Sequence, residues 1–133
     1  MTSFQQSARQ LWHRLRPAAP AAAHERVVST ALVVTERPAR YGKQLASHMS
    51  KRITTTWDEA ARTGVLDFGR GRADLTCVEG GLRLVLDCAA ADVAGLEDAV
   101  GRHLVRFGVR DELVVSWVRE DGTPGTVQRK LED

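Results

Sequence analysis

The stretch ADLTCVEGGLRLVLDC, residues 73–88, decides the fold class of this chain. Apolar and polar side chains alternate on both sides of the pair Gly80-Gly81, a pattern typical of two antiparallel strands joined by a tight turn. One face of this hairpin carries Ala73, Leu75, Cys77, Leu82, Leu84, Leu86 and Cys88. The other face carries Asp74, Thr76, Arg83 and Asp87. The alternation predicts an antiparallel sheet that is covered on one side and wet on the other.

Two amphipathic helices flank the hairpin in the sequence. The first is predicted from Pro38, which suits the first turn of a helix, to about Arg52. The second is predicted from a cap at Asp92 to Phe107. Further strands are predicted at 26–34, 53–57, 65–68 and 111–119. The order β-α-β-β-β-β-α-β predicts an α+β fold, a two-layer sandwich in which both helices pack on one face of a mainly antiparallel sheet.

The 133 residues fit one domain with a tail at each end. We expect the domain proper at 26–119, a polar C-terminal tail at 120–133 and a flexible basic N-terminal tail or linker at 1–25. Within the N-terminal tail, residues 3–16 place Phe4, Leu11, Trp12 and Leu15 on one side of a helix. Two readings stay open for this segment: a disordered tail, or a short helix that docks on a partner or a membrane surface.

The net charge and its distribution argue against some classes of binding partner. The net charge is +2, and the body of the chain is close to neutral. Since phosphate contacts need clustered Lys and Arg, we expect no nucleic-acid partner. No segment reaches the roughly 20 apolar residues of a transmembrane helix, and the N-terminus lacks the apolar core of a signal peptide. We therefore expect a cytoplasmic protein.

Cys77 and Cys88 are expected to be free thiols. A turn at Gly80-Gly81 places Cys77 opposite Leu84 and leaves Cys88 several residues away along the ladder. A disulfide needs Cα atoms within about 7 Å, which this register does not allow. Free thiols fit a reducing compartment.

Several motifs resemble those of a known family. They are PARYGKQLASH at 38–48, DFGRG at 67–71, LRLVL at 82–86, and the run from Leu96 through HLVRF at 103–107, followed by RDEL at 110–113 and Trp117. Together they resemble the bacterial domain-of-unknown-function family 2218. The resemblance implies a compact α+β domain and no established activity. It also implies a setting, because members of that family occur beside, or fused to, siderophore-interacting flavoproteins and iron-uptake genes.

A histidine lies at the same place in each predicted helix. Tyr41, Leu45, His48 and Met49 have the same spacing as Leu96, Val100, His103 and Leu104. Both imidazoles should lie at the edge of the core, and they converge if the helices are adjacent. Together they could ligate iron, another transition metal or a haem, or one could act as an acid or base. The alternative is two half-buried histidines that are hydrogen-bonded to carbonyls or carboxylates.

Four basic residues are candidates for contacts to an anion. Arg40 and Lys43 lie on the exposed side of the first helix, together with Ser47 and Lys51, and Arg70 and Arg72 flank the turn at 69–71. A phosphate-binding loop is excluded at this turn because a strand follows it and not a helix. The alternative is that these charges form an ordinary solvated surface.

Three function classes follow. The first is a non-enzymatic binding or accessory module of iron or siderophore metabolism, with a siderophore-interacting or iron-uptake protein as its partner. The second is an interaction or homodimerisation domain without a small-molecule ligand. The third is a small enzyme of unknown reaction, which no nucleophile–base pair or paired-carboxylate pattern supports.

Overall fold

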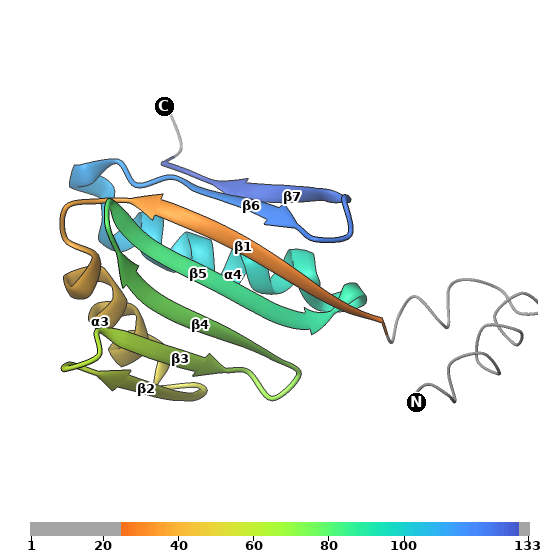
Figure 1. Cartoon of the computed structure of the whole chain (residues 1–133), viewed down its shortest axis with the longest axis horizontal. Coiled ribbons are helices and arrows are strands. Elements are labelled where there is room, and N and C mark those ends of the chain that lie inside the picture. The colour runs from red at the N-terminus through yellow and green to blue at the C-terminus, as the bar shows by residue number, and fades with distance from the viewer. Residues whose placement is uncertain (1–24, 131–133) are drawn as a thin grey trace, which may run out of the picture.

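One antiparallel sheet of seven strands forms the first layer of the molecule (Figure 1). The computed structural model describes residues 25–130. Along the sheet the strands stand in the order β2-β3-β4-β5-β1-β6-β7. Their bounds are β1 Arg26–Val34, β2 Thr54–Asp58, β3 Thr63–Asp67, β4 Gly71–Val78, β5 Gly81–Ala89, β6 Val115–Arg119 and β7 Pro124–Gln128. The long central strands β1, β4 and β5 carry most of the buried aliphatic side chains of the sheet.

Two helices form the second layer, and both cover the same face of the sheet. Helix α3, Pro38–Met49, packs on β2 to β5, whereas α4, Val93–Phe107, packs on β5, β1, β6 and β7. Short 3-10 turns, Ala90–Asp92 and Val109–Asp111, precede and follow α4. Within residues 25–130, neither helix has the length and apolar content that crossing a membrane requires. The predicted α+β sandwich with two helices on one sheet face is therefore confirmed.

The β4–β5 hairpin is present, but its register differs from the predicted one by two residues. Val78 pairs with Gly81, so the loop consists of Glu79 and Gly80 instead of Gly80 and Gly81. Gly80 has a φ of 89°, a left-handed conformation that glycine adopts without steric cost. Gly81 is instead the first paired residue of β5. A pair of glycines does not reveal which one bends the chain, and this produced the error.

Both cysteines are free, as predicted. In the corrected register Cys77 faces Leu82 and Cys88 faces Gly71. Burial raises the pKa of both thiols, so both stay protonated at neutral pH. This keeps them out of nucleophilic chemistry.

Two element boundaries differ from the predicted ones by three residues or more. Helix α3 ends at Met49 and not near Arg52, because the amides of Arg52 and Ile53 both donate to the Met49 carbonyl and turn the chain into β2. The last predicted strand, 111–119, is shorter, because a 3-10 turn occupies 109–111 and β6 begins at Val115.

The prediction of a polar tail over 120–133 is wrong for 124–128, which form the edge strand β7. Thr126 and Gln128 turn inward, toward α4. Thr126 donates a hydrogen bond to Glu97 of α4, and Gln128 accepts one from the Trp117 indole of β6, so polar side chains occupy the inward positions of this strand. Hydropathy alone cannot distinguish such a strand from a solvated tail. The predicted N-terminal tail, apart from Glu25, and the helix predicted at 3–16 lie outside the described residues.

Candidate functional site

The two candidate histidines lie side by side. The imidazole centroids of His48 on α3 and His103 on α4 are 5.0 Å apart, with the rings tilted by 47°. The ring of Phe107 stands edge-on to His48 at 5.2 Å. All three rings are half-buried. The predicted convergence is therefore present, and it follows from equal spacing on two adjacent helices.

Hydrogen bonding fixes the tautomer of His103. Its Nδ1 lies 2.6 Å from the carbonyl oxygen of Ala99, one helical turn earlier. Since a carbonyl only accepts, Nδ1 carries the proton and donates it. In the neutral ring this leaves the lone pair on Nε2. His103 thus keeps one nitrogen for a ligand while the other ties the ring to its own helix.

The charges around His48 favour its neutral form. Burial lowers the pKa of His48, and the nearby His103, Lys51, Arg106 and Arg52 lower it further. His48 is therefore a neutral imidazole at pH 7. It can accept or donate a hydrogen bond or bind a metal in this state.

His48 also lines an open groove of about 470 Å³ along the exposed side of α3. We call it the cationic groove; its lining residues are Arg40, Lys43, Gln44, Ser47, His48, Lys51 and Phe107. Three of these side chains are cationic and none is acidic. Of these three cations, only Lys43 has an acidic neighbour within salt-bridge reach among the described residues, Glu59 at 3.9 Å. A concave surface of this charge attracts and concentrates anions.

The structure separates the four basic candidates. Arg40 and Lys43 line the cationic groove with His48. Arg70 lies 3.7 Å from Asp92, and Arg72 lies 3.0 Å from Asp74. Arg70 and Arg72 are thus paired with carboxylates and do not line the groove.

A metal centre made by the protein alone finds little support in the geometry. Within residues 25–130, no group of three or more His, Cys, Asp or Glu side chains is placed to hold a metal ion. The two imidazoles would supply only two ligands, whereas a closed structural site for a metal such as zinc usually has four. Any metal at His48 and His103 would have to bring its remaining ligands with it.

A buried polar network on the other side of α4 was not predicted. Glu97 is fully buried, and its carboxylate accepts hydrogen bonds from Arg119, Ser29 and Thr126. Burial opposes the ionisation of Glu97, but these hydrogen bonds outweigh it and lower the pKa of the carboxyl group. Each carboxylate oxygen already accepts at least two hydrogen bonds, so the network ties α4 to β1, β6 and β7 and leaves no oxygen for a ligand.

Gln128 extends this network to the core. Its side-chain amide donates to Thr126 at 2.8 Å, and its carbonyl oxygen accepts from the Trp117 indole at 2.8 Å. Gln128 and Trp117 are both buried. The hydrogen bonds of this network therefore hold the polar strand β7 against β6 and α4.

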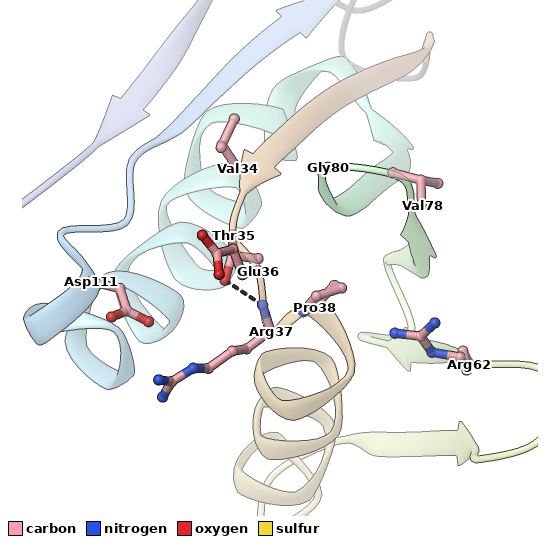
Figure 2. A pocket seen from close by; sticks show the side chains of 9 residues that line it. All are labelled: Val34, Thr35, Glu36, Arg37, Pro38, Arg62, Val78, Gly80 and Asp111. Carbon is pink, nitrogen blue, oxygen red and sulfur yellow. Dashed lines mark hydrogen bonds between the residues drawn. The ribbon is translucent and has the colours of Figure 1, made fainter.

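A second, larger cavity of about 800 Å³ lies at the start of α3 (Figure 2). Its charged lining residues are Glu36, Arg37, Arg62 and Asp111, so the charges balance. Figure 2 shows the guanidinium groups of Arg37 and Arg62 on opposite sides of the beginning of α3. Asp111 accepts a hydrogen bond from the Tyr41 hydroxyl. Because its charges neither converge nor share a sign, this cavity is a weaker candidate for a ligand site.

Sequence reasoning missed part of the cationic groove. Gln44 was not considered. Ser47 and Lys51, which the helical pattern places on the same exposed side as Arg40 and Lys43, were not among the four named candidates. Phe107 was assigned only to the apolar side of its helix. A search for polar residues at i+4 from Arg40 and Lys43 would have found Gln44 and Ser47.

The fold and the groove define a small α+β sandwich protein whose recognisable chemistry lies on the outer side of two adjacent helices. The chain belongs to the family described as uncharacterised protein conserved in bacteria, DUF2218, whose model matches residues 30–118. This confirms the resemblance seen in the sequence. No functionally curated protein matches the chain.

A solved structure shares the fold. The NMR structure of PA4090 from Pseudomonas aeruginosa is 22% identical in sequence and superposes with a TM-score of 0.50. The match covers 73% of this chain and 96% of the other. At this level of identity the likeness concerns the fold alone.

Proposed function

We propose that the domain is a non-enzymatic binding module that holds an anionic ligand in the cationic groove, and that ferric siderophores are its ligand class. One observation carries the proposal. The groove collects Arg40, Lys43 and Lys51 beside an imidazole and a phenyl ring, with no carboxylate among its lining residues. Cationic side chains beside aromatic rings suit an anionic ligand that also carries flat aromatic groups, such as the catecholate rings of a siderophore.

Because two imidazoles are too few to hold a free iron ion, we infer that iron reaches the groove already bound by a chelator. The oxygen donors of a siderophore surround the ferric ion, so the protein needs to supply only outer contacts to the complex. Cationic and aromatic side chains make such contacts, whereas a protein-built iron site would need more ligands than His48 and His103. The setting of the family beside siderophore-interacting proteins points in the same direction, as an association. A siderophore-interacting protein is then the partner that delivers or receives the ligand.

Haem fits the same residues less well. An iron ligated by both histidines would place the porphyrin between two rings whose centroids are now 5.0 Å apart. The rings would have to move apart to admit the porphyrin, which would disturb the packing of the two imidazoles and Phe107. A haem bound through one histidine is an alternative outcome of the titration below.

Titration of the full chain with ferric citrate and a ferric catecholate siderophore, followed by tryptophan fluorescence and calorimetry, tests the proposal. Lys51→Glu should weaken binding at least about tenfold, equivalent to about 1.4 kcal/mol, because it places a carboxylate in the groove. Arg83→Glu makes the same change of charge on an exposed position of β5, on the sheet face that the helices leave open. It should leave the affinity within about twofold, because the groove lies on the helix layer and surface charges are screened over about 10 Å.

Two results would contradict this assignment. Equal weakening by both variants would show that only net charge matters, and absence of binding to either complex would remove the siderophore class. His48→Ala combined with His103→Ala then tests the imidazoles. If the affinity for the ferric complexes is unchanged in the double variant, the histidines do not take part. A Soret band on haem addition that the double variant lacks would replace the siderophore by haem.

The affinity should also depend on pH through His48. Its pKa is lowered in the free protein, and a bound anion favours the charged imidazolium. Binding therefore takes up a proton, and the affinity should rise as the pH falls below the ordinary histidine value of about 6.5. His48→Gln should remove this rise. The difference between wild type and variant, measured by calorimetry with the same ligand, cancels the titration of the ligand itself; parallel pH profiles would contradict a role for His48.

A further inference from the structure

An exposed apolar patch lies on the face of the sheet that the helices leave open. Among the large aliphatic side chains of residues 25–130, six are exposed. Four of these lie in strands, at positions that alternate with the buried, helix-facing residues, and they therefore belong to the open face. We call these four the outer patch: Leu32, Val34, Val118 and Val127. Val34 and Val118 are the most exposed, at 75% and 71%. In Figure 1 both helices lie behind the sheet, so the face that they leave open is turned toward the viewer.

The strand register makes the patch continuous. Thr30 on β1 pairs with Val118 on β6, so Leu32 lies diagonally next to Val118. Ser116 pairs with Val127 on β7, which adds the third strand. Apolar side chains that gather over three adjacent strands mark an interaction surface more often than single exposed ones do.

The N-terminal segment is connected directly to this surface. The chain enters β1 at Arg26, and the patch residue Leu32 lies six residues further along, at about 20 Å. The nine residues 17–25 can span about 30 Å when extended, which is enough to bring residue 16 to any part of the patch. Pro17 and Pro20 favour an extended connection.

Residues 3–16 have the apolar pattern and the length that would cover the outer patch. At 100° per residue, Phe4, Ala8, Leu11, Trp12 and Leu15 fall on one side of a helix. Arg9, Arg14 and Arg16 fall outside that apolar side. Fourteen helical residues measure about 21 Å. Along β1 the patch extends for about 13 Å, from the level of Thr30, which pairs with Val118, to Val34. A helix of this length covers the patch.

We propose that residues 3–16 form an amphipathic helix that packs its apolar side on the outer patch of the same molecule and makes a third layer over the sheet. The tether holds the segment near the patch at an effective concentration in the millimolar range, so even a weak contact is populated. A second copy of the chain would have to compete with this local segment for the same surface. The inference is independent of any ligand in the cationic groove.

Paramagnetic relaxation in NMR tests the docking on the full chain. A nitroxide attached through Ser7→Cys, in a Cys77→Ser background that leaves only the buried Cys88, should broaden the methyl signals of Leu32, Val118 and Val127. The methyl signals of Leu45 and Leu96, which lie on the helices behind the sheet, are the internal control and should keep their intensity. Leu11→Ser combined with Trp12→Ser should abolish the broadening without changing the control signals.

A mixed sample distinguishes docking of the helix within one molecule from docking between two copies of the chain. Spin-labelled chain without isotope is added to isotope-labelled chain without a nitroxide, and light scattering gives the mass. Docking within one molecule predicts no broadening in this mixture and a monomeric mass. Broadening of the patch in the mixture together with a dimeric mass would overturn the proposal in favour of a homodimer. Absence of patch broadening in the singly labelled chain would overturn it as well.

Discussion

Replacing Arg119 by methionine is expected to lower the free energy of unfolding by about 3–5 kcal/mol, because the change leaves a buried carboxylate without its charge partner. The Glu97 side chain has no exposed surface, and that of Arg119 is 10% exposed. Their contact has two hydrogen bonds, from Nε to Oε2 at 3.0 Å and from Nη2 to Oε1 at 2.8 Å. Methionine fills much of the space of arginine but donates no hydrogen bond. Urea unfolding followed by circular dichroism measures the loss.

Arg102→Met is the matched control. Arg102 pairs with Asp98 at 3.0 Å on the same helix α4, but both side chains are about half exposed. The control should cost less than about 1 kcal/mol, because water replaces the lost partner. Similar losses in the two variants would contradict a special role for the buried pair.

A double variant keeps this prediction testable if Arg119→Met does not fold. Glu97→Leu together with Arg119→Met removes both charges, and an apolar pair of similar volume often replaces a buried ion pair at little cost. The double variant should therefore be more stable than Arg119→Met alone. The reverse order would show that the hydrogen bonds of Glu97 to Ser29 and Thr126 matter more than its charge partner.

Gly101→Ala is expected to destabilise the fold by about 1–3 kcal/mol, as extra atoms in a packed interior do. A Cβ atom at Gly101 would lie 1.9 Å from Oε1 of Gln128, far inside contact distance. Gln128 is buried and holds the Trp117 indole through that same oxygen, so it cannot move without breaking the hydrogen bond. Thermal unfolding of the variant measures the change, and an altered indole proton shift of Trp117 in the NMR spectrum would confirm the cause.

Gly95→Ala on the same helix should have the opposite sign. A Cβ atom there meets nothing within 4 Å, and alanine is favoured over glycine in a helix by about 0.8–1.0 kcal/mol. If Gly101→Ala destabilises the fold and Gly95→Ala stabilises it, α4 approaches β7 closely at Gly101 but not at Gly95. Stabilisation by both substitutions would contradict the close approach.

The sequence predictions were correct where a local pattern of side chains determines the structure, and they were wrong where contacts between separate segments determine it. The hairpin at 73–88 was predicted from the alternation of seven apolar side chains, and it was found. Its register was wrong by two residues, because Gly80 and Gly81 offer the same local flexibility and only the pairing of Val78 with Gly81 selects one of them. Strand β7 was missed because its inward positions, Thr126 and Gln128, are polar and are stabilised by partners far away in the sequence.

The candidate site was predicted in part for the same reason. Equal spacing on two amphipathic helices placed His48 and His103 at corresponding edges, and adjacent helices bring them to 5.0 Å. Periodicity placed Lys51 on the same side as Arg40 and Lys43, but it could not show that Phe107 from α4 borders the same groove. Nor could it show that Arg70 and Arg72 are paired with Asp92 and Asp74.

The sequence by itself determined the fold class, the two helices and the free thiols, because alternation, helical periodicity and turn residues act over neighbouring positions. Only the tertiary structure decided the register of the hairpin, the place of β7, the burial of Glu97 and the composition of the cationic groove. The last three depend on which distant residues meet, such as Glu97 with Arg119 or His48 with Phe107, and the register depends on which of two adjacent glycines bends the chain. The local pattern of a chain does not contain those distances, whereas packing two layers around one core fixes them.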